Sequence, residues 1–289
     1  AGTTANINGT LYGTGASNLD TFDFTDTQTS TTAAHVVLNE IDDTNYIGTF
    51  NKTGSALMDV TNYFRSYQAN ISSGSLYVNN IASGTNFIVD STMTFTNSLF
   101  GGNSNITADE VVIGTGATAA PGNSIGTTNI TGDETFAAGS TYQVEFEQTS
   151  MQNGGANNDT TNVSGTVTID NTDTSLDLIN LNGKFYVHEV LDIITAGTLN
   201  GEFTTPTLTG YDVDTADLRL GSRIDYTVYN DGNTMKLAVN RIASDYANSP
   251  ELTDMSHNEK EVVKSIDAIS TGYGGDITNA LDALEKYYY

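Results

Sequence analysis

Apolar and polar residues alternate in short runs along much of the chain. In residues 142–146, YQVEF, every second side chain is bulky and apolar, and in residues 127–131, TTNIT, successive side chains would point to opposite faces. A period of two residues is typical of a β-strand with one buried face. Pro121, Gly122, Gly139 and Ser140 are turn residues. The pattern therefore predicts strands of about five residues, separated by frequent changes of direction.

The same pattern of short strand-like runs and turn residues extends from Ala1 to about Phe100. Strand-like runs occur at residues 5–8, 22–24, 35–38, 76–78 and 87–89, and Gly, Asn, Ser and Thr separate them. No strict hexapeptide or nonapeptide repeat is present, so we predict an irregular solenoid whose coils of roughly 20 to 30 residues stack about 4.8 Å apart. Outward Thr and Asn side chains on successive coils would then form ladders.

Two segments depart from this pattern of alternating residues. Residues 39–68 contain five aromatic residues but little alternation, which predicts a loop or short helix that projects from a coil and packs its aromatic rings. Residues 149–162 are almost wholly polar, which predicts an exposed loop.

Bulky residues are denser between Leu181 and Ile242. A solenoid ends in an open edge, so a terminal closure is needed, and Asn230-Asp231-Gly232-Asn233 is a favourable hairpin turn. We therefore predict a cap in this region. Its predicted core consists of Phe185, Tyr186, Val190, Leu191, Ile193, Gly201, Phe203, Tyr226 and Leu237.

The periodicity becomes helical from Asp254. Ser256 and Glu259 form a capping box, and apolar residues then recur on one helical face. Glycines at 272–275 interrupt this pattern, and Asp276 can cap a second short helix. The chain is therefore expected to carry a short helical tail.

Several motifs resemble one protein family in the same order. The run APGNSIG at 120–126, then FAAGS at 136–140 leading into YQVEF, is similar to the passenger region of bacterial autotransporters just ahead of its C-terminal cap. Residues 161–169 resemble the next strand of that region. Residues 193–203, which include Gly201, resemble its autochaperone segment, and the tail resembles the helical linker of the family. The similarity covers roughly residues 115 to 245, and no barrel strands follow the tail, where the chain departs from the family.

The resemblance implies export through an outer-membrane barrel encoded by the same gene, and a cap that nucleates folding. Together with the strand pattern it predicts an all-β fold: a right-handed parallel β-helix (solenoid) with a C-terminal β-sandwich-like cap and a short helical tail. The expected divisions are a stalk at 1–180, an autochaperone-like cap at 181–245 and a helical linker at 246–289.

Composition narrows the function classes. The 289 residues include 35 Asp and Glu against 10 Lys and Arg, a formal charge of −25, which disfavours nucleic acid and anionic lipid as partners. With no Cys, the chain has no disulfide, thiolate metal site or Cys nucleophile. The start of the chain lacks the features of a signal peptide, which we expect to be already missing, and no apolar run approaches the roughly 20 residues of a spanning helix.

Candidate catalytic chemistry is sparse. Residues 122–126, GNSIG, match Gly-x-Ser-x-Gly in letters but lie in a turn between two predicted strands and not between a strand and a helix, so they give no nucleophile elbow. A structural role is favoured over catalysis for each of the three histidines, His35, His188 and His257. Paired acids such as Asp42-Asp43 and Asp212-x-Asp214 could serve a glycosidase or lyase, but acids in polar loops are usually solvated. The spacings of Asp20, Asp23 and Asp26 and of Asp170 and Asp173 lack the loop that fixes calcium, so no cofactor is expected and calcium is the weaker alternative.

Two hypotheses remain. The favoured one is a non-catalytic structural or adhesive module, secreted or on the surface of a Gram-negative bacterium, which contacts a cell-surface protein or glycan receptor or associates with itself. Its further expected partner is its own outer-membrane barrel, with no membrane insertion of this fragment. The alternative is an exported β-helical carbohydrate-active enzyme, a polysaccharide lyase or hydrolase, which requires acids and aromatic rings converging in one groove.

Overall fold

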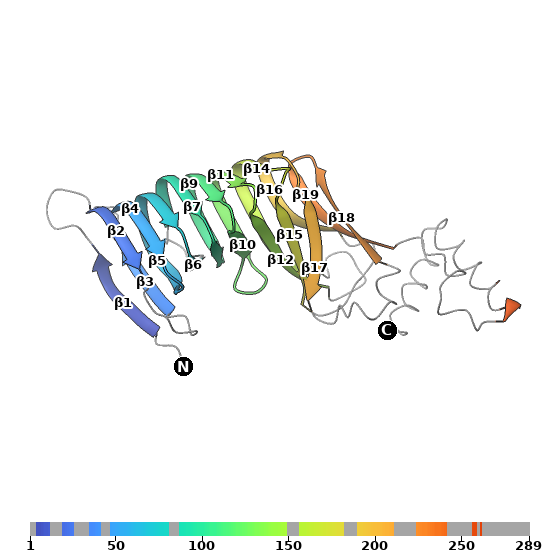
Figure 1. Cartoon of the computed structure of the whole chain (residues 1–289), viewed down its shortest axis with the longest axis horizontal. Helices are drawn as coiled ribbons and strands as arrows, with labels where there is room; N and C mark the ends of the chain where they lie inside the picture. The colour runs from blue at the N-terminus through green and yellow to red at the C-terminus, as the bar shows by residue number, and fades with distance from the viewer. Residues whose placement is uncertain are drawn as a thin grey trace.

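The computed structural model of the protein describes residues 4–11, 19–25, 35–41, 47–80, 87–148, 156–181, 190–210, 224–241, 256–258 and 261. The described part is almost entirely β-strand, and most strand pairs are parallel. The strands lie side by side in a row that follows the chain from its N-terminal to its C-terminal part (Figure 1).

The strands form two stacks, and the chain passes back and forth between them. The first stack contains, in pairing order, β1 (Thr4–Leu11), β3 (His35–Ile41), the beginning of β5 (Leu57–Ile71), β6 (Gly74–Val78), β8 (Ser98–Gly102), β10 (Thr118–Pro121), β12 (Thr141–Gln148), β15 (Ser175–Asn180) and β17 (Thr205–Gly210). All of these pairs are parallel.

The second stack is built in the same way. It contains β2 (Leu19–Thr25), β4 (Ile47–Thr53), the remainder of β5, β7 (Phe87–Phe95), β9 (Ser104–Ile113), β11 (Thr127–Phe136), β14 (Thr160–Ile169) and β16 (Val190–Asn200), all parallel. Two antiparallel strands extend it, because β16 pairs with β19 (Thr234–Arg241) and β19 with β18 (Ile224–Asp231). The short β13 (Ala156–Asn158) forms an antiparallel pair with the end of β12.

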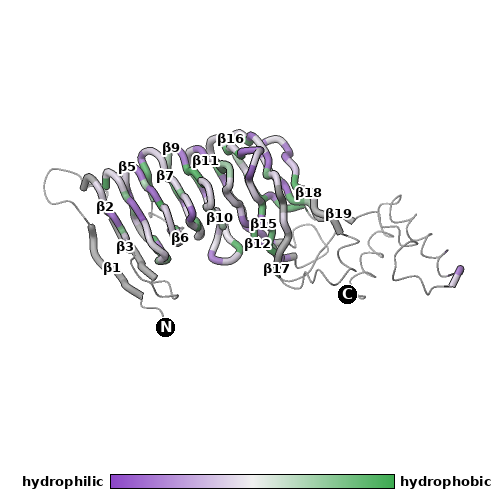
Figure 2. Tube along the Cα trace, in the orientation of Figure 1, coloured by the Kyte–Doolittle hydropathy of each residue, from purple (hydrophilic) through white to green (hydrophobic). Residues whose placement is uncertain are grey.

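Alternation of side chains explains how each stack has one buried face. In β15 every second residue is buried, and β9 alternates in the same way on either side of a shift between Ala108 and Val111. Hydrophilic and hydrophobic residues alternate along the strands (Figure 2). Inward rings meet directly. Those of Phe64 and Phe87, which are paired on neighbouring strands of the second stack, stack 4.4 Å apart. Those of Phe95 on β7 and Phe100 on β8, which belong to different stacks, lie 4.8 Å apart. The core is therefore a continuous column of apolar side chains between the two stacks.

The predicted ladders are present on the outward faces. The amide of Asn129 donates to Asn105 at 3.1 Å, and that of Asn162 donates to Asn129 at 3.0 Å, so one ladder crosses β9, β11 and β14. A second ladder joins Asn70 to Asn51 at 2.9 Å and Asn51 to Asp23 at 2.8 Å. These contacts stabilise the stacking of coils by roughly 0.2 to 1 kcal/mol per pair.

The strands of the second stack are longer than the predicted five residues, because they continue through a bend. The pairing shifts register at the same level in β5–β7, β7–β9, β9–β11 and β14–β16. At this level Gly132 has φ of 136°, and a Cβ there would lie 1.7 Å from the carbonyl oxygen of Ala108. The bends of successive coils thus pack so closely that only glycine fits at position 132 of β11.

Two predictions about irregular segments are wrong. Residues 47–53 and 57–71, expected in a loop or helix, are the strands β4 and β5, where Phe50 and Phe64 are buried in the core. Their apolar residues alternate once the bend is taken into account. Within the predicted loop the described residues Ala156–Asn158 form the short strand β13, whereas β14 agrees with the strand predicted at 161–169.

The parallel ladders continue past residue 180 through β16 and β17, and the antiparallel strands begin with β18. In the tail the structure describes residues 256–258 and 261, of which His257, Asn258 and Glu261 are helical. The rest of the predicted helical linker lies outside the described residues. The three-way domain division remains a prediction.

The stacked bend can be tested by a pair of glycine substitutions. Gly132→Ala is expected to lower the free energy of unfolding by about 3 kcal/mol or more, because the new methyl group would overlap a backbone carbonyl. Gly232→Ala is the control: its φ is also positive, at 63°, but no atom lies within 4 Å of the added Cβ, so we expect a loss of about 1 kcal/mol. Urea unfolding measures both, and equal losses would contradict the close stacking at Gly132.

Candidate functional site at the cap junction

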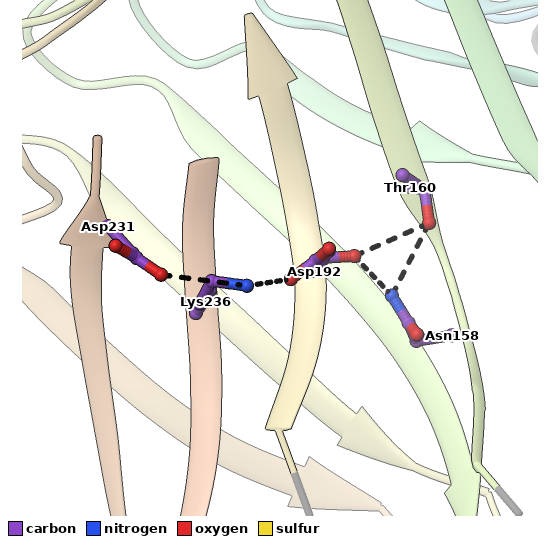
Figure 3. Close-up of polar contacts among 5 residues, drawn as sticks. All are labelled: Asn158, Thr160, Asp192, Asp231 and Lys236. Atoms are coloured by element: carbon purple, nitrogen blue, oxygen red, sulfur yellow. Dashed lines mark hydrogen bonds and ion pairs between the residues drawn. The ribbon is translucent and has the colours of Figure 1, made fainter. Parts of the chain in front are cut away.

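The cap junction is the region where β16, β18 and β19 join β12 and β14. A row of polar side chains crosses its outer surface (Figure 3). Lys236 on β19 donates to Asp192 on β16 at 2.7 Å and lies 3.9 Å from Asp231 on β18. The backbone oxygen of Asp192 accepts from Asn158 at 2.8 Å and from Thr160 at 3.5 Å. Five elements are connected in this row.

Lys236 is the one cation of this row. Its hydrogen bond to Asp192 raises the pKa of the Lys236 ammonium group, and the charges of Asp192 and Asp231 act in the same direction. The ammonium therefore stays charged at neutral pH and is paired within the junction. Its chemistry is that of a structural ion pair.

Tyr142 connects the two stacks through the interior. It is fully buried on β12, and its hydroxyl lies 2.8 Å from the backbone oxygen of Ile193 on β16 and 3.1 Å from the hydroxyl of Thr161 on β14. Burial raises the pKa of Tyr142 well above its usual value, so the phenol remains a donor. The bond to Ile193 joins residues 51 positions apart in the sequence and holds the start of the cap to the stalk.

Aromatic packing strengthens the same contact. The ring of Phe203, just beyond β16, lies 5.2 Å from Phe136 and 5.8 Å from Tyr142, and Phe136 and Tyr142 are 5.4 Å apart. Edge and offset contacts at these separations are favourable for aromatic rings. Phe203 therefore packs the segment after β16 against the buried rings of β11 and β12.

Asp159 holds the corner before β14. Its two carboxylate oxygens accept the backbone N–H groups of Gly126 and Glu145, each at 2.8 Å, and Thr160 donates its N–H to the oxygen of Gly126 at 3.0 Å. Burial raises the pKa of Asp159 to about 7, although the two backbone hydrogen bonds act to lower it. Gly126 is the last residue of the APGNSIG run, so this motif is tied to the neighbouring coil.

Glu134 is buried in the apolar interior. It points inward from β11 between Val111 and Val167, which are its neighbours in the parallel ladders, and its Oε2 has no hydrogen-bond partner among the described residues. Burial raises the pKa of Glu134 to about 8. At neutral pH the group is therefore mostly protonated, which avoids an uncompensated charge in the core.

The structure describes the burial of six of the residues predicted for the cap core. Leu191, Ile193, Phe203 and Leu237 are buried. Gly201 has φ of 87° and lies so close to β14 that a Cβ would be 2.1 Å from the oxygen of Ile169.

Val190 was predicted to lie in the core, and this is wrong because the residue is 46% exposed. It shares the outward face of β16 with Asp192, whereas Leu191 and Ile193 face inward. The alternation along this strand already contained that signal. Phe185, Tyr186 and the side chain of Tyr226 lie outside the described residues.

Met235 and Ile194 are also fully buried, and neither they nor the roles of Tyr142, Asp159 and Glu134 were predicted from the sequence. For Glu134 a signal existed, since it alternates in phase with Ile130 and Phe136, which face inward. The predicted hairpin turn is confirmed: Asp231 pairs with Thr234 across Gly232 and Asn233.

The candidate catalytic and metal residues are not brought together in the described part. His35 lies in β3, His257 is exposed, and His188 is outside the described residues, as are Asp42, Asp43, Asp212 and Asp214. Asp23 is in the outward ladder, Asp20 lies in β2, Asp26 is not described, and Asp170 accepts hydrogen bonds from Thr172. Within the described ranges no group of three or more His, Asp or Glu is placed to hold a metal ion.

No model of a known protein family matches this chain, and no curated protein matches it either. Among the helical residues that the structure describes, none forms a helix long and apolar enough to cross a bilayer. The function must therefore be argued from the chain's own geometry.

The cap is expected to control folding of the stalk. Leu191→Ala should lower the free energy of unfolding by about 2 to 5 kcal/mol and slow refolding of the whole rod, because Leu191 is buried where the cap meets the last coils. Val78→Ala, equally buried in an earlier coil, should act mainly on its own coils. Stopped-flow refolding compares the two variants, and equal effects on the refolding rate would count against a nucleating cap.

Glu134 should make stability depend on pH. Its pKa is higher in the folded state, at about 8, than the ordinary 4.5, so the folded protein holds the proton more tightly and loses stability as pH rises from about 4.5 to 8. The loss should be a few kcal/mol, at about 1.4 kcal/mol per pKa unit.

In Glu134→Gln this pH dependence should be reduced but not abolished, because Asp159, whose pKa is raised to about 7, acts in the same direction; urea unfolding at several pH values measures the difference. Glu202→Gln, at an exposed position, is the matched control and should behave like the unchanged protein. An unchanged pH profile in Glu134→Gln would show that Glu134 is not the group responsible.

Proposed function

We propose that this chain is the stalk and cap of an exported bacterial autotransporter passenger, a right-handed parallel β-helix that acts by surface contact rather than by catalysis. The parallel ladders of both stacks, with the chain passing between them, are compatible with this fold. The antiparallel strands β18 and β19, together with the inserted Phe203, support a cap that closes the C-terminal end.

The observation that supports surface contact best is the charge of the stalk. Between Arg65 and Lys184 the sequence has no Lys, Arg or His and carries eleven Asp and Glu residues, of which Glu134 and Asp159 are buried. The two preceding cations are already engaged, since Lys52 is buried with its ammonium 2.9 Å from the oxygen of Ser73, and Arg65 is paired with Asp90 at 3.1 Å. A long acidic surface of this kind favours association with a basic or polar partner.

The outward side chains are held in place by the ladders. A surface whose groups are already ordered loses less conformational entropy on binding. The same regularity would let identical faces of two copies meet, so the proposed partner is a receptor on a cell surface or a second copy of this chain. This function places the protein on the outside of a Gram-negative cell or in its surroundings.

The cap has a proposed role of its own. Tyr142, Phe203 and Asp159 connect it to the last coils, so these coils gain their complete core only when the cap is in place. We assign residues 1–180 to the stalk, 181–245 to the cap and 246–289 to the linker towards a barrel.

Contact through acidic groups should depend on salt. Binding to a basic partner, with a lysine-rich protein as the probe, is expected to weaken strongly between 0.1 M and 1 M salt, because the screening length falls from about 10 Å to about 3 Å. Isothermal titration calorimetry measures this, with and without calcium. No binding at low salt would contradict the proposed function.

A screen against acidic and neutral polysaccharides for turnover completes the test. Turnover that is lost when one pair of carboxylates is changed to amides would favour the alternative of a carbohydrate-active enzyme.

A further inference from the structure

One aromatic ring lies on the outward face of the first stack. Tyr77 on β6 is half-buried, and its ring extends over the neighbouring strand β8, so that a Cβ on Gly101 would lie 2.8 Å from its Cε1 atom and 3.1 Å from its Cδ1 atom. The ring therefore occupies the space that a side chain at position 101 would fill. The next strand carries only the small Ala120 in the same row.

Polar groups without positive charge surround this ring. In the same outward row Asp59 precedes Tyr77, and Gln143 and Asp177 follow Ala120 and are joined by a hydrogen bond of 3.3 Å. Burial and the nearby Glu145 raise the pKa of the Tyr77 phenol. The phenol thus stays neutral beside the carboxylates.

The position of the carboxylates is defined by hydrogen bonds. Asn79 donates to Asp59 at 2.8 Å and accepts from Asn123 at 3.0 Å. Thr207 donates to the other oxygen of Asp177 at 3.1 Å. The face thus combines a seated aromatic ring with carboxylates and amides on strands about 4.8 Å apart.

We propose that this face, which we call the Tyr77 face (Asp59, Tyr77, Gly101, Ala120, Gln143 and Asp177), binds a glycan whose sugar rings carry free amino groups. The inference rests on the proposed function of surface contact and names its partner.

The aromatic ring and the carboxylates of the Tyr77 face favour a sugar ligand with amino groups. A sugar ring can lie against an aromatic ring, and a protonated amine is attracted both by the π-system and by the carboxylates beside it. Acidic sugars are disfavoured, because no Lys, Arg or His occurs between Arg65 and Lys184. The row runs from strand to strand along the stack, so a chain of sugars can meet the tyrosine and the carboxylates in turn.

The test uses the full chain and calorimetry, since the protein has no Trp for fluorescence. At mildly acidic pH, where sugar amines are protonated, the probes are a chitosan hexasaccharide with free amines, the fully N-acetylated hexasaccharide, an oligogalacturonate and an oligolysine. We expect the chitosan probe to bind, the N-acetylated probe to bind at least about tenfold more weakly, and the oligogalacturonate not to bind.

The variants separate the ring from the charge. Tyr77→Ala should weaken binding of the chitosan probe roughly tenfold, whereas Tyr77→Phe keeps the ring and should bind within about twofold of the unchanged protein. Tyr67→Ala is the matched control, because Tyr67 is 53% exposed on the part of β5 that belongs to the second stack. Asp59→Asn should weaken binding of the chitosan probe and leave binding of the N-acetylated probe unchanged. Comparing Tyr77→Ala with Tyr77→Phe in a thermal melt shows whether any loss comes from unfolding.

The outcomes distinguish this inference from the proposed function. Oligolysine bound as tightly as chitosan, with Tyr77→Ala binding both normally, would overturn the glycan site and leave the acidic contact surface standing. Failure of every cationic probe at low salt would overturn the proposed function as well.

Discussion

The structure depends on the parallel backbone ladder between successive coils. Because paired residues of neighbouring strands face the same way, each side chain meets its counterpart in the next coil, and one unsuitable residue disturbs a whole column. The stacked rings of Phe64 and Phe87 and the ladder of Asn105, Asn129 and Asn162 are two results of this constraint, inside and outside. The aligned bend at Gly132 is a third, since a shift in one strand must be copied by the next.

The last coil of such a stack has no neighbour on one side. Its core side chains and its backbone N–H and C=O groups would therefore be exposed to water, which is unfavourable. At the cap junction β16 pairs with the antiparallel strand β19, Phe203 packs in the core, and Tyr142 donates a hydrogen bond to Ile193. It also brings ionisable groups inside. Asp159 is supported by two backbone N–H groups, whereas Glu134 avoids a buried charge through its raised pKa of about 8. Among the described residues, Glu134 and Asp159 are thus two buried carboxyl groups whose pKa values are raised.

Positively charged and acidic side chains have different positions in the protein. Of the few cations that the structure describes, Lys52, Arg65 and Lys236 serve contacts within the protein. The outward faces of the stalk are left to acids, amides and hydroxyls held in ladders. Charged outward residues disfavour edge-to-edge pairing of separate rods and give an ordered acidic surface, on which Tyr77 and Tyr67 are aromatic residues.

The sequence by itself determined the strand content, the outward ladders, the hairpin at Gly232 and the burial of Leu191, Ile193, Phe203 and Leu237, because all of these follow from residue types and a period of two. That period also indicated that Val190 faces outward with Asp192 and that Glu134 faces inward with Phe136. It could not show where a strand bends, which is why residues 39–68 were predicted as irregular. Only the tertiary structure decided which groups meet across the two stacks. Tyr142 and Ile193 are 51 residues apart, and Tyr77 lies over Gly101 on another strand, so their contacts depend on the register between coils, which no local pattern specifies.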